Sequence, residues 1–478
     1  MRKVKIYNWI DNQPVAAAND EWIDNINPCN GNVISQIPRS KAKDGFAAVE
    51  SALGCYSLGG GGNSGAAGLS PNDRTDLLLA VANRMESRLE ELAMAESKDT
   101  GKPFKISVGG DVPRAIDNMR FFAKLLAGET TQSSASLNSL NYVLRRPLGV
   151  VALITPWNFP IHLLTWKLAP AIAMGNSVVA KPSELTPTSA FILAQIFKEV
   201  GAAPGLFNLV HGYGSEIGDT LVRHPNIEGV SFTGGTETGK AIALAAAPLL
   251  KKTSFELGGK NPSVVFADCE FEKTLDTVAR AAFFNSGQVC LCGSRILIDS
   301  KIYNKFAEGL VEKALFYKKE VGPLISQSHR EKVMSYVHSA RQEGNILCGG
   351  EIYGDSQGAY LEPTIIDGVH HDSSIVQEEI FGPVVTLHPF DTEAEALELA
   401  NETAYGLSAS IFTTNLKRAH YFSEHVQSGM VWVNDWNLRD LRVPFGGMKQ
   451  SGFGREGGKY SLRFFSQDRN VCIRFNYD

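Results

Sequence analysis

The sequence predicts an α/β fold made of an open parallel sheet, a second α/β unit and a small β arm. Three observations support this prediction. Short apolar runs alternate with helical stretches in two long series, two segments remote in the chain alternate apolar and polar residues, and 478 residues exceed what one core organises. We therefore expect a first domain over 1–123 and 146–256, a second over 257–455, and an arm from 124–145 and 456–478.

The first domain is predicted from its alternating elements. Residues 74–98 have leucines at helical spacing, and the Gly-rich stretch 59–68 before them indicates a loop. From residue 150 onward, strands bounded by turns alternate with helices, a pattern typical of parallel sheets. The expected strands are 150–154, 177–180, 207–210 and 229–232, and the expected helices are 162–174, 186–200, 214–223 and 238–250.

The second domain and the arm follow from similar patterns. Strands are expected at 263–266, 295–298, 383–388 and 430–433, with helices at 271–284, 301–315 and 328–343. Residues 140–144 and 462–475 alternate apolar and polar side chains. Because such strands are half-buried, we expect them to pair in a small sheet that another subunit completes.

Composition and charge exclude several classes of protein. The 46 basic residues against 51 acidic ones give a net charge of −5 with no basic block, which argues against nucleic acid as a partner. No apolar run approaches the roughly 18 residues that a membrane span requires, and the N-terminus lacks the apolar stretch of a signal peptide. The seven cysteines form no CxxC pair, so we expect a reducing compartment, the cytoplasm, and no metal.

Three residues are candidates for chemistry. Cys290 lies at the end of a helical stretch beside glycines that permit close approach, although a lone cysteine is more often a small buried apolar residue. Glu256 lies between two apolar residues, where desolvation favours a general base, or it caps a strand end. Asn158 follows a buried strand and can donate to an oxyanion. Together they provide the nucleophile, base and oxyanion donor of acyl transfer.

The sequence resembles the aldehyde dehydrogenase superfamily from near residue 20 to the C-terminus. Glu256 precedes Cys290 by 34 residues, as in that family, and a GxGxxG fingerprint is absent. The resemblance is carried by ordered motifs: Thr100-Gly101-Lys102-Pro103, Pro156-Trp157-Asn158-Phe159-Pro160, Lys181-Pro182-Ser183-Glu184, Phe232-Thr233-Gly234-Gly235-Thr236, Glu256-Leu257-Gly258-Gly259-Lys260, Gly287-Gln288-Val289-Cys290, Glu378-Glu379-Ile380-Phe381-Gly382-Pro383 and Pro444-Phe445-Gly446-Gly447.

The resemblance implies a Rossmann-like NAD-binding domain, a catalytic domain and an oligomerisation arm, in the order given above. It also implies that Cys290 attacks an aldehyde, that Asn158 holds the oxyanion, and that Glu256 activates water. A carboxylate at Glu184 accepts from a ribose 2′-OH and repels a 2′-phosphate, so NAD is favoured over NADP. The implied coenzyme residues are Thr155, Pro156, Trp157, Lys181, Ser183, Glu184, Phe232, Gly234, Gly235, Leu257, Glu379 and Phe381.

Within the superfamily, the sequence most resembles 2-hydroxymuconic and 2-aminomuconic semialdehyde dehydrogenases. Cys290-Leu291-Cys292, the segment 436–442 and the segment 454–458 carry this similarity. Because such substrates bear a carboxylate, Arg439 and Arg114 are candidates to bind it, unless Arg439 merely pairs with Asp440. Apolar walls are expected from Phe159, Trp166 and Phe445, and a proton relay from Lys167 and Glu456.

Four functions stay open at this stage. The main prediction is oxidation of a semialdehyde in aromatic catabolism by a homo-oligomer, either a dimer or a tetramer. A broad-range dehydrogenase of apolar aldehydes is the alternative, with only the two arginines against it. A CoA-acylating enzyme is disfavoured because such enzymes tend to lack a base at the position of Glu256. A non-catalytic binding protein is disfavoured because Cys290, Asn158 and Glu256 are all present.

Overall fold

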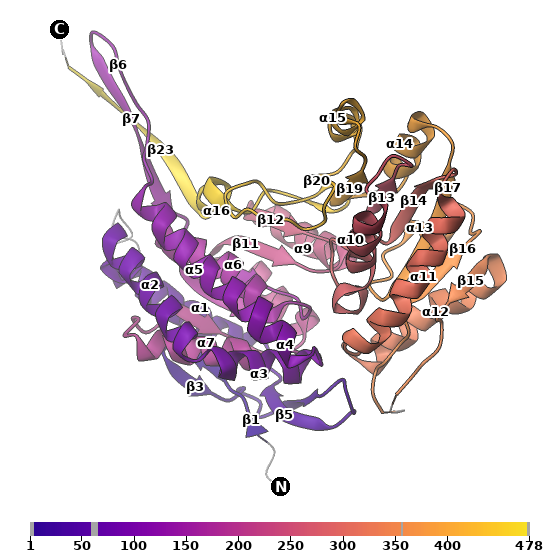
Figure 1. Cartoon of the computed structure of the whole chain (residues 1–478). Coiled ribbons are helices and arrows are strands. Elements are labelled where there is room, and N and C mark those ends of the chain that lie inside the picture. Colours follow the sequence, from indigo (N-terminus) through magenta and orange to yellow (C-terminus); the bar gives the residue numbers. More distant parts are fainter. Residues whose placement is uncertain (1–3, 59–65, 355–356, 476–478) are drawn as a thin grey trace.

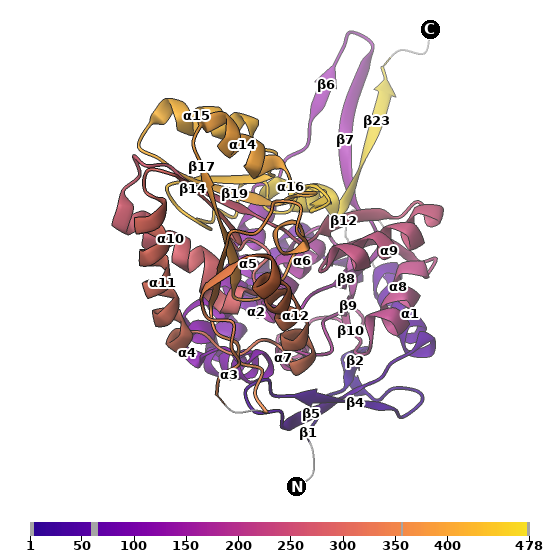
Figure 2. The ribbon, with the colours of Figure 1, turned by 90° about the vertical axis from the view of Figure 1, so that its right-hand side faces the viewer.

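The structure is a computed structural model that describes residues 4–58, 66–354 and 357–475. It contains two large sheets with helices packed on both, and a narrow β arm that projects from the body (Figures 1 and 2). This architecture confirms the predicted α/β fold class. Within the described residues, no helix combines the length and apolar character that a membrane span needs.

The first sheet has five parallel strands at its centre. They lie in the order β12 (Lys252–Glu256), β11 (Ile227–Thr233), β8 (Val150–Ile154), β9 (Ser177–Lys181) and β10 (Phe207–Leu209). Antiparallel strands extend both edges, with β2 (Asn8–Ile10) and β3 (Gln13–Val15) beyond β10, and β22 (Gly452–Phe453) beyond β12. The parallel strands confirm the prediction, whereas the short edge strands carry no alternation that could have predicted them.

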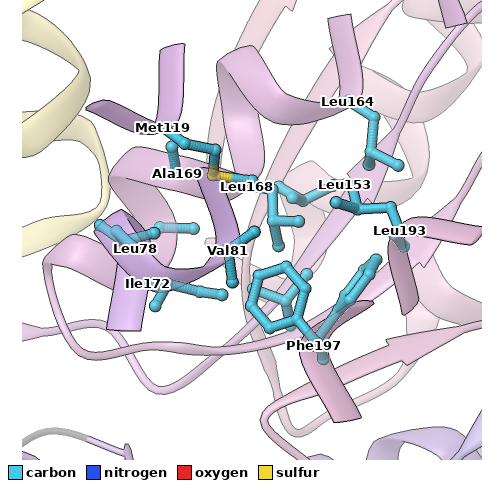
Figure 3. Close-up of a cluster of buried hydrophobic side chains, with 14 of the residues drawn as sticks. Leu78, Val81, Met119, Leu153, Leu164, Leu168, Ala169, Ile172, Leu193 and Phe197 are labelled. Atoms are coloured by element: carbon cyan, nitrogen blue, oxygen red, sulfur yellow. The ribbon is translucent and has the colours of Figure 1, made fainter. Parts of the chain in front are cut away.

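Alternate side chains of β8 enter two separate cores, as the period of a strand requires. Val151 and Leu153 pack in one apolar cluster, and Val150, Ala152 and Ile154 in another on the opposite face. The first cluster takes most of its helical side chains from four helices, and Figure 3 shows part of it. These helices are α2 (Pro71–Ser87), α5 (Val112–Ala127), α6 (Pro160–Ala173) and α7 (Thr188–Glu199), while α1 (Ala42–Leu58), α8 (Asp219–Arg223) and α9 (Thr236–Ala246) cover the second.

The second sheet has seven strands, all parallel except β15 at one edge. Its order is β15 (Asn345–Cys348), β16 (Thr364–Asp367), β17 (Val384–Phe390), β14 (Arg295–Asp299), β13 (Pro262–Val265), β19 (Ser408–Phe412) and β20 (Met430–Val433). The accompanying helices are α10 (Phe271–Phe283), α11 (Tyr303–Glu320), α12 (Gln327–Glu343), α13 (Ser374–Gln377), α14 (Glu393–Asn401) and α15 (Leu416–His425).

The arm confirms the predicted pairing of two remote segments. Strand β7 (Ser139–Pro147) pairs antiparallel with β23 (Ser466–Arg474), and β6 (Ser133–Ala135) pairs with the other edge of β7. The strand expected over 462–475 begins only at Ser466. Residues before it form helix α16 (Gly458–Phe464), whose Leu462 is buried in the first core.

Three expected helices differ from the structure. The helix expected over 74–98 is divided into α2 and α3 (Leu89–Thr100) by Arg88, which has φ −115° and ψ 24°. Apolar spacing continues across this single non-helical residue, so periodicity could not detect it. Residues 214–218 form a π turn before α8, and α9 ends at Ala246 before a 3-10 turn.

The remaining elements are short. The Gly-rich loop expected over 59–68 falls mostly outside the described residues, and its last three form a 3-10 turn. A small sheet near the N-terminus contains β1 (Val4–Lys5), β5 (Val33–Pro38) and β4 (Trp22–Ile26). The other short elements are α4 (Phe104–Ile106), β18 (Tyr405–Gly406) and β21 (Met448–Lys449).

Candidate active site

A cavity of about 310 Å³ is lined by residues from both large domains. Residues that directly follow β8, β11 and β12 form one side, at the carboxyl edge where open parallel sheets bind ligands. The cavity therefore joins most of the predicted catalytic, coenzyme and substrate residues. Its lining comprises Arg114, Pro156, Trp157, Asn158, Phe159, His162, Leu163, Thr233, Gly234, Gly235, Leu257, Gly258, Val289, Cys290, Leu291, His329, Lys332, Glu379, Phe381, Asn437, Arg439 and Phe445.

Cys290 is held in a turn rather than at a helix end. Helix α10 ends at Phe283, and both Asn285 and Ser286 adopt left-handed conformations, with φ of 53° and 56°. The amide of Asn261 donates to the backbone oxygen of Cys290 at 2.7 Å. A side chain at Gly259 would lie 2.8 Å from that same oxygen, so this turn requires glycine there. The thiol thus has a fixed place on the cavity wall.

The electrostatic surroundings favour the protonated form of the Cys290 thiol. Burial and then the carboxylates of Glu256 and Glu379 raise the pKa of Cys290 well above its usual value. A hydrogen bond from its own backbone N–H acts in the opposite direction. Nucleophilic attack needs the thiolate, so the chemistry requires a nearby base to take the proton.

Asn158 is oriented to donate into the cavity. It lies between β8 and α6, and its Nδ2 donates to the backbone oxygen of Gln288 at 3.0 Å. An amide nitrogen carries two hydrogens, so a second N–H stays available for an oxyanion beside Cys290. The fixed first hydrogen bond makes this donor preorganised.

Glu256 is the last residue of β12 and is buried. Its Oε1 has no hydrogen-bond partner among the described residues. Burial and the neighbouring carboxylate of Glu456 raise its pKa to about 8. A carboxyl group that titrates close to neutral pH is suited to accept and release a proton.

A buried polar cluster lies behind Glu256. Lys167 Nζ contacts Glu456 Oε1 at 2.5 Å and donates to Ser231 Oγ at 3.0 Å. Ser231 Oγ also lies 3.3 Å from Glu456 Oε1. Lys167 and Glu456 therefore form one hydrogen-bonded unit, although neither lines the cavity, and sequence analysis did not identify Ser231 as its third member.

The carboxyl ends of β8 and β11 have features suited to a dinucleotide. A side chain at Gly234 would lie 2.5 Å from the ring of Phe232, so only glycine leaves the backbone open there, next to the N-terminus of α9. The hydroxyls of Thr155 and Thr233 are buried, with no hydrogen-bond partner among the described residues. An open backbone and unused hydroxyl groups fit the phosphates and riboses of a nucleotide.

Phe381 and Glu379 also line the cavity. Phe381 has φ of 59°, and its backbone oxygen lies 2.8 Å from His329 Nε2. Its ring packs edge-on against Trp157, with centroids 5.3 Å apart. Glu379 Oε1 accepts from the N–H of Gly259 at 2.9 Å. These contacts fix both predicted coenzyme residues.

Lys181, Ser183 and Glu184 lie outside this cavity. Lys181 ends β9 and the other two follow it, at the same edge of the first sheet, with β11 and β8 between β9 and the strand of Glu256. Lys181 Nζ lies 3.2 Å from Glu184 Oε2 and is buried. The predicted adenosine residues are thus near one another but apart from the reacting groups.

The predicted substrate arginines lie on the cavity wall. Arg439 is half-buried, and its guanidinium lies 4.3 Å from the ring of Trp166 and 5.4 Å from that of Phe445. Burial and the charge of Arg114 lower the pKa of Arg439 to about 10. Neither arginine has an acidic partner within 4 Å in the described part of the chain, and Asp440 pairs with Arg442 instead. An anionic ligand would compensate these charges.

Two of the aromatic residues predicted to form apolar walls differ in whether they reach the cavity. Phe159 lines the cavity, and Lys102 Nζ lies 3.9 Å above its ring. Trp166 is 2% exposed and lies behind Arg439 rather than on the wall.

Sequence reasoning missed several lining residues. They include His162, Leu163, His329, Lys332 and Asn437. His162 and Leu163 had a usable signal. Each lies three or four residues from both Phe159 and Trp166, which is the spacing of one helical face.

The sequence is similar to those of proteins from one known family. The Aldehyde dehydrogenase family profile matches residues 15–471. A 2-aminomuconic 6-semialdehyde dehydrogenase from a Pseudomonas species is 50% identical over 422 residues, covering 84% of this chain and 86% of its own. A 2-hydroxymuconic semialdehyde dehydrogenase from Pseudomonas sp. strain CF600 is 40% identical and covers 99% of this chain and 100% of its own.

A solved structure shares the fold over nearly the whole chain. It is a betaine aldehyde dehydrogenase from Staphylococcus aureus in complex with NAD+. The two chains superpose with a TM-score of 0.94 at 36% identity, covering 99% of this chain and 95% of that one.

Proposed function

The chain belongs to the aldehyde dehydrogenase family, and on this premise we propose that it oxidises a carboxylate-bearing semialdehyde with NAD. The observation that carries the proposal is one cavity containing Cys290, Asn158 and Arg439. Cys290 and Asn158 provide a nucleophile and an oxyanion donor, and Arg439 provides a positive charge that can bind a carboxylate. The proposal assigns the first sheet to NAD binding and the second to catalysis.

In the first half of the proposed reaction, Cys290 loses its proton to a nearby base and its sulfur attacks the aldehyde carbon. The carbonyl oxygen becomes an oxyanion, which accepts hydrogen bonds from Asn158 and from the backbone N–H of Cys290. Bound NAD would supply the two-electron acceptor for the hydride on this carbon. The C–H bond breaks, the carbonyl forms again, and the acyl group stays on sulfur as a thioester.

In the second half, Glu256 takes a proton from water, and the oxygen attacks the thioester carbon. The C–S bond breaks, the carboxylic acid leaves, and the sulfur regains a proton. Lys167 and Glu456 lie behind Glu256, where they relay its proton away from the cavity. The presence of this base supports water, rather than CoA, as the acyl acceptor.

The substrate class is supported by charge and by the relatives. Arg439 and Arg114 bring two positive charges to the cavity wall, and neither forms an ion pair within the described residues. The relatives at 50% and 40% identity act on muconic semialdehydes, as their names state. A broad-range dehydrogenase of apolar aldehydes is the second candidate, supported by Phe159, Leu163 and Phe445 on the wall.

Replacing Arg439 by alanine tests the substrate class. We expect the ratio of kcat/KM for 2-hydroxymuconic semialdehyde to that for hexanal to fall about 10- to 100-fold, because a charge-assisted hydrogen bond to the carboxylate is lost. NADH formation at 340 nm measures both rates. Arg442→Ala is the matched control, since Arg442 is 79% exposed on the same loop. If wild type prefers hexanal, the semialdehyde proposal is wrong.

The proposal also includes a preference for NAD over NADP. Glu184 presents a carboxylate beside Lys181, where a ribose 2′-OH would donate to it and a 2′-phosphate would be repelled. Replacing Glu184 by glutamine should raise the kcat/KM ratio of NADP over NAD by roughly tenfold, because Lys181 then attracts the phosphate unopposed. An unchanged ratio would place coenzyme discrimination elsewhere.

We also propose a homo-oligomer, dimer or tetramer, in the cytoplasm. The arm has two outer strand edges, on β6 and β23, and extends away from the body (Figure 2). Unpaired strand edges favour addition of another chain. Six cysteines are free thiols, which a reducing compartment preserves: Cys29, Cys269, Cys290, Cys292, Cys348 and Cys472.

A further inference from the structure

We propose that His162 is a positioning residue for substrate specificity: its unprotonated ring accepts a hydrogen bond from Arg439 and holds the guanidinium toward the substrate carboxylate. The inference rests on the proposed function. It adds a residue outside the reacting groups and predicts how the anion site is built before substrate enters.

The contact between the two side chains determines the ring's protonation state. Arg439 Nη1 lies 2.5 Å from His162 Nε2. A guanidinium has only donors, so a hydrogen bond between them requires a lone pair on Nε2. A protonated ring would instead present N–H to N–H. Burial, followed by the charges of Arg439 and Arg114, lowers the pKa of His162 well below its ordinary value, in agreement with this geometry.

The ring itself is held firmly in place. His162 lies in the first turn of α6 and is 4% exposed. Asn118 on α5 donates to the backbone oxygen of His162 at 3.1 Å, and the ring lies edge-on to that of Phe159, with centroids 6.5 Å apart. The acceptor for Arg439 therefore belongs to the packed interface of two helices.

The remaining contacts of the Arg439 guanidinium restrict its orientation. Trp166 lies 4.3 Å from it and Phe445 lies 5.4 Å from it, which restricts motion perpendicular to its plane. One of the two N–H groups on Nη1 is used by His162, so the other one, together with those on Nη2 and Nε, is left for a ligand. Since ordering a free arginine on binding weakens affinity, an arginine ordered in advance binds a carboxylate more tightly.

The experiment compares four variants: His162→Leu, which removes the acceptor; His162→Gln, which can keep one; Arg439→Ala; and the double variant His162→Leu/Arg439→Ala. His420→Leu is the matched control, since His420 is an exposed histidine on α15. The probes are 2-hydroxymuconic semialdehyde, hexanal, and 2,4-hexadienoate, an unreactive planar carboxylate whose inhibition constant reports anion binding without turnover.

We expect His162→Leu to raise the inhibition constant of hexadienoate and the KM of the semialdehyde about tenfold, with a smaller change in the KM of hexanal. His162→Gln should recover most of this loss. Adding His162→Leu to Arg439→Ala should change anion binding less than twofold further, because the two residues act through one another.

Three results would overturn the inference, and two of them concern the measured binding and Michaelis constants. One is an equal rise in KM for hexanal and the semialdehyde in His162→Leu, which indicates general damage to the cavity. The other is additivity of the two substitutions. If Arg439→Ala loses the preference for the semialdehyde and His162→Leu retains it, only this inference fails. If wild type has no such preference, the proposed function fails with it.

Discussion

Replacing Cys290 by alanine is expected to lower NADH formation by about 10⁴-fold or more, because the covalent intermediate can no longer form. Neither of the other two catalytic candidates can replace the sulfur as the group that bonds to the aldehyde carbon. Asn158 and Glu256 would still bind and polarise the aldehyde, yet neither can hold the acyl group while hydride leaves. NADH formation at 340 nm with saturating semialdehyde measures the loss.

Cys292→Ala is the matched control for this experiment. Cys292 is buried two residues away, and the amide of Asn261 donates to its backbone oxygen at 2.9 Å, as it does to that of Cys290. A change at Cys292 perturbs the same turn without touching the nucleophile. Wild-type activity in Cys290→Ala, or an equal loss in Cys292→Ala, would contradict the assigned nucleophile.

The parts of the fold predicted from the sequence share one physical property. Strands such as β8 and β9 are short, apolar and fully buried, and helices lie between them, so local pattern determines their place in a parallel sheet. Strand β2 is different. It has three residues, and Trp9 pairs with Leu209 about 200 residues later, a contact that no local pattern encodes.

In the candidate site too, some residues could be predicted from the sequence and others could not. Cys290, Glu256 and Asn158 were identified because their residue types and motifs imply chemistry, and the structure brings Cys290 and Asn158 to one cavity with Glu256 beside Cys290. His162 was missed because a histidine on an apolar helix is usually a packed core residue. Its role depends on Arg439, 277 residues away, which only the folded chain reveals.

Replacing Glu256 by glutamine is expected to stop the reaction after hydride transfer. Removing this carboxylate also removes a negative charge that raises the pKa of Cys290, so thiolate formation should become easier. Hydrolysis loses its base and should slow about 10²- to 10⁴-fold. Rapid mixing should show a burst of about one equivalent of NADH per subunit, followed by a slow steady state.

The pH dependence gives a second measurement of the same assignment. The pKa of Glu256 is raised to about 8, so at pH 6 the carboxyl group is mostly protonated and cannot accept a proton from water. In wild type, the rate of hydrolysis should therefore rise with pH and level off above about pH 8. In Glu256→Gln this rise should vanish, because glutamine does not titrate in this range.

Glu398→Gln, an exposed substitution on α14, serves as the control and should keep both the steady-state rate and the rise with pH. A glutamine variant at position 256 that still turns over at the wild-type rate would show that another group activates water. Loss of the burst together with the steady state would instead place Glu256 in the first half of the reaction, as the base for Cys290. The proposed role of Glu256 requires the burst to remain while hydrolysis is slowed. Only this result shows that the carboxylate acts in hydrolysis of the thioester and is not needed for hydride transfer.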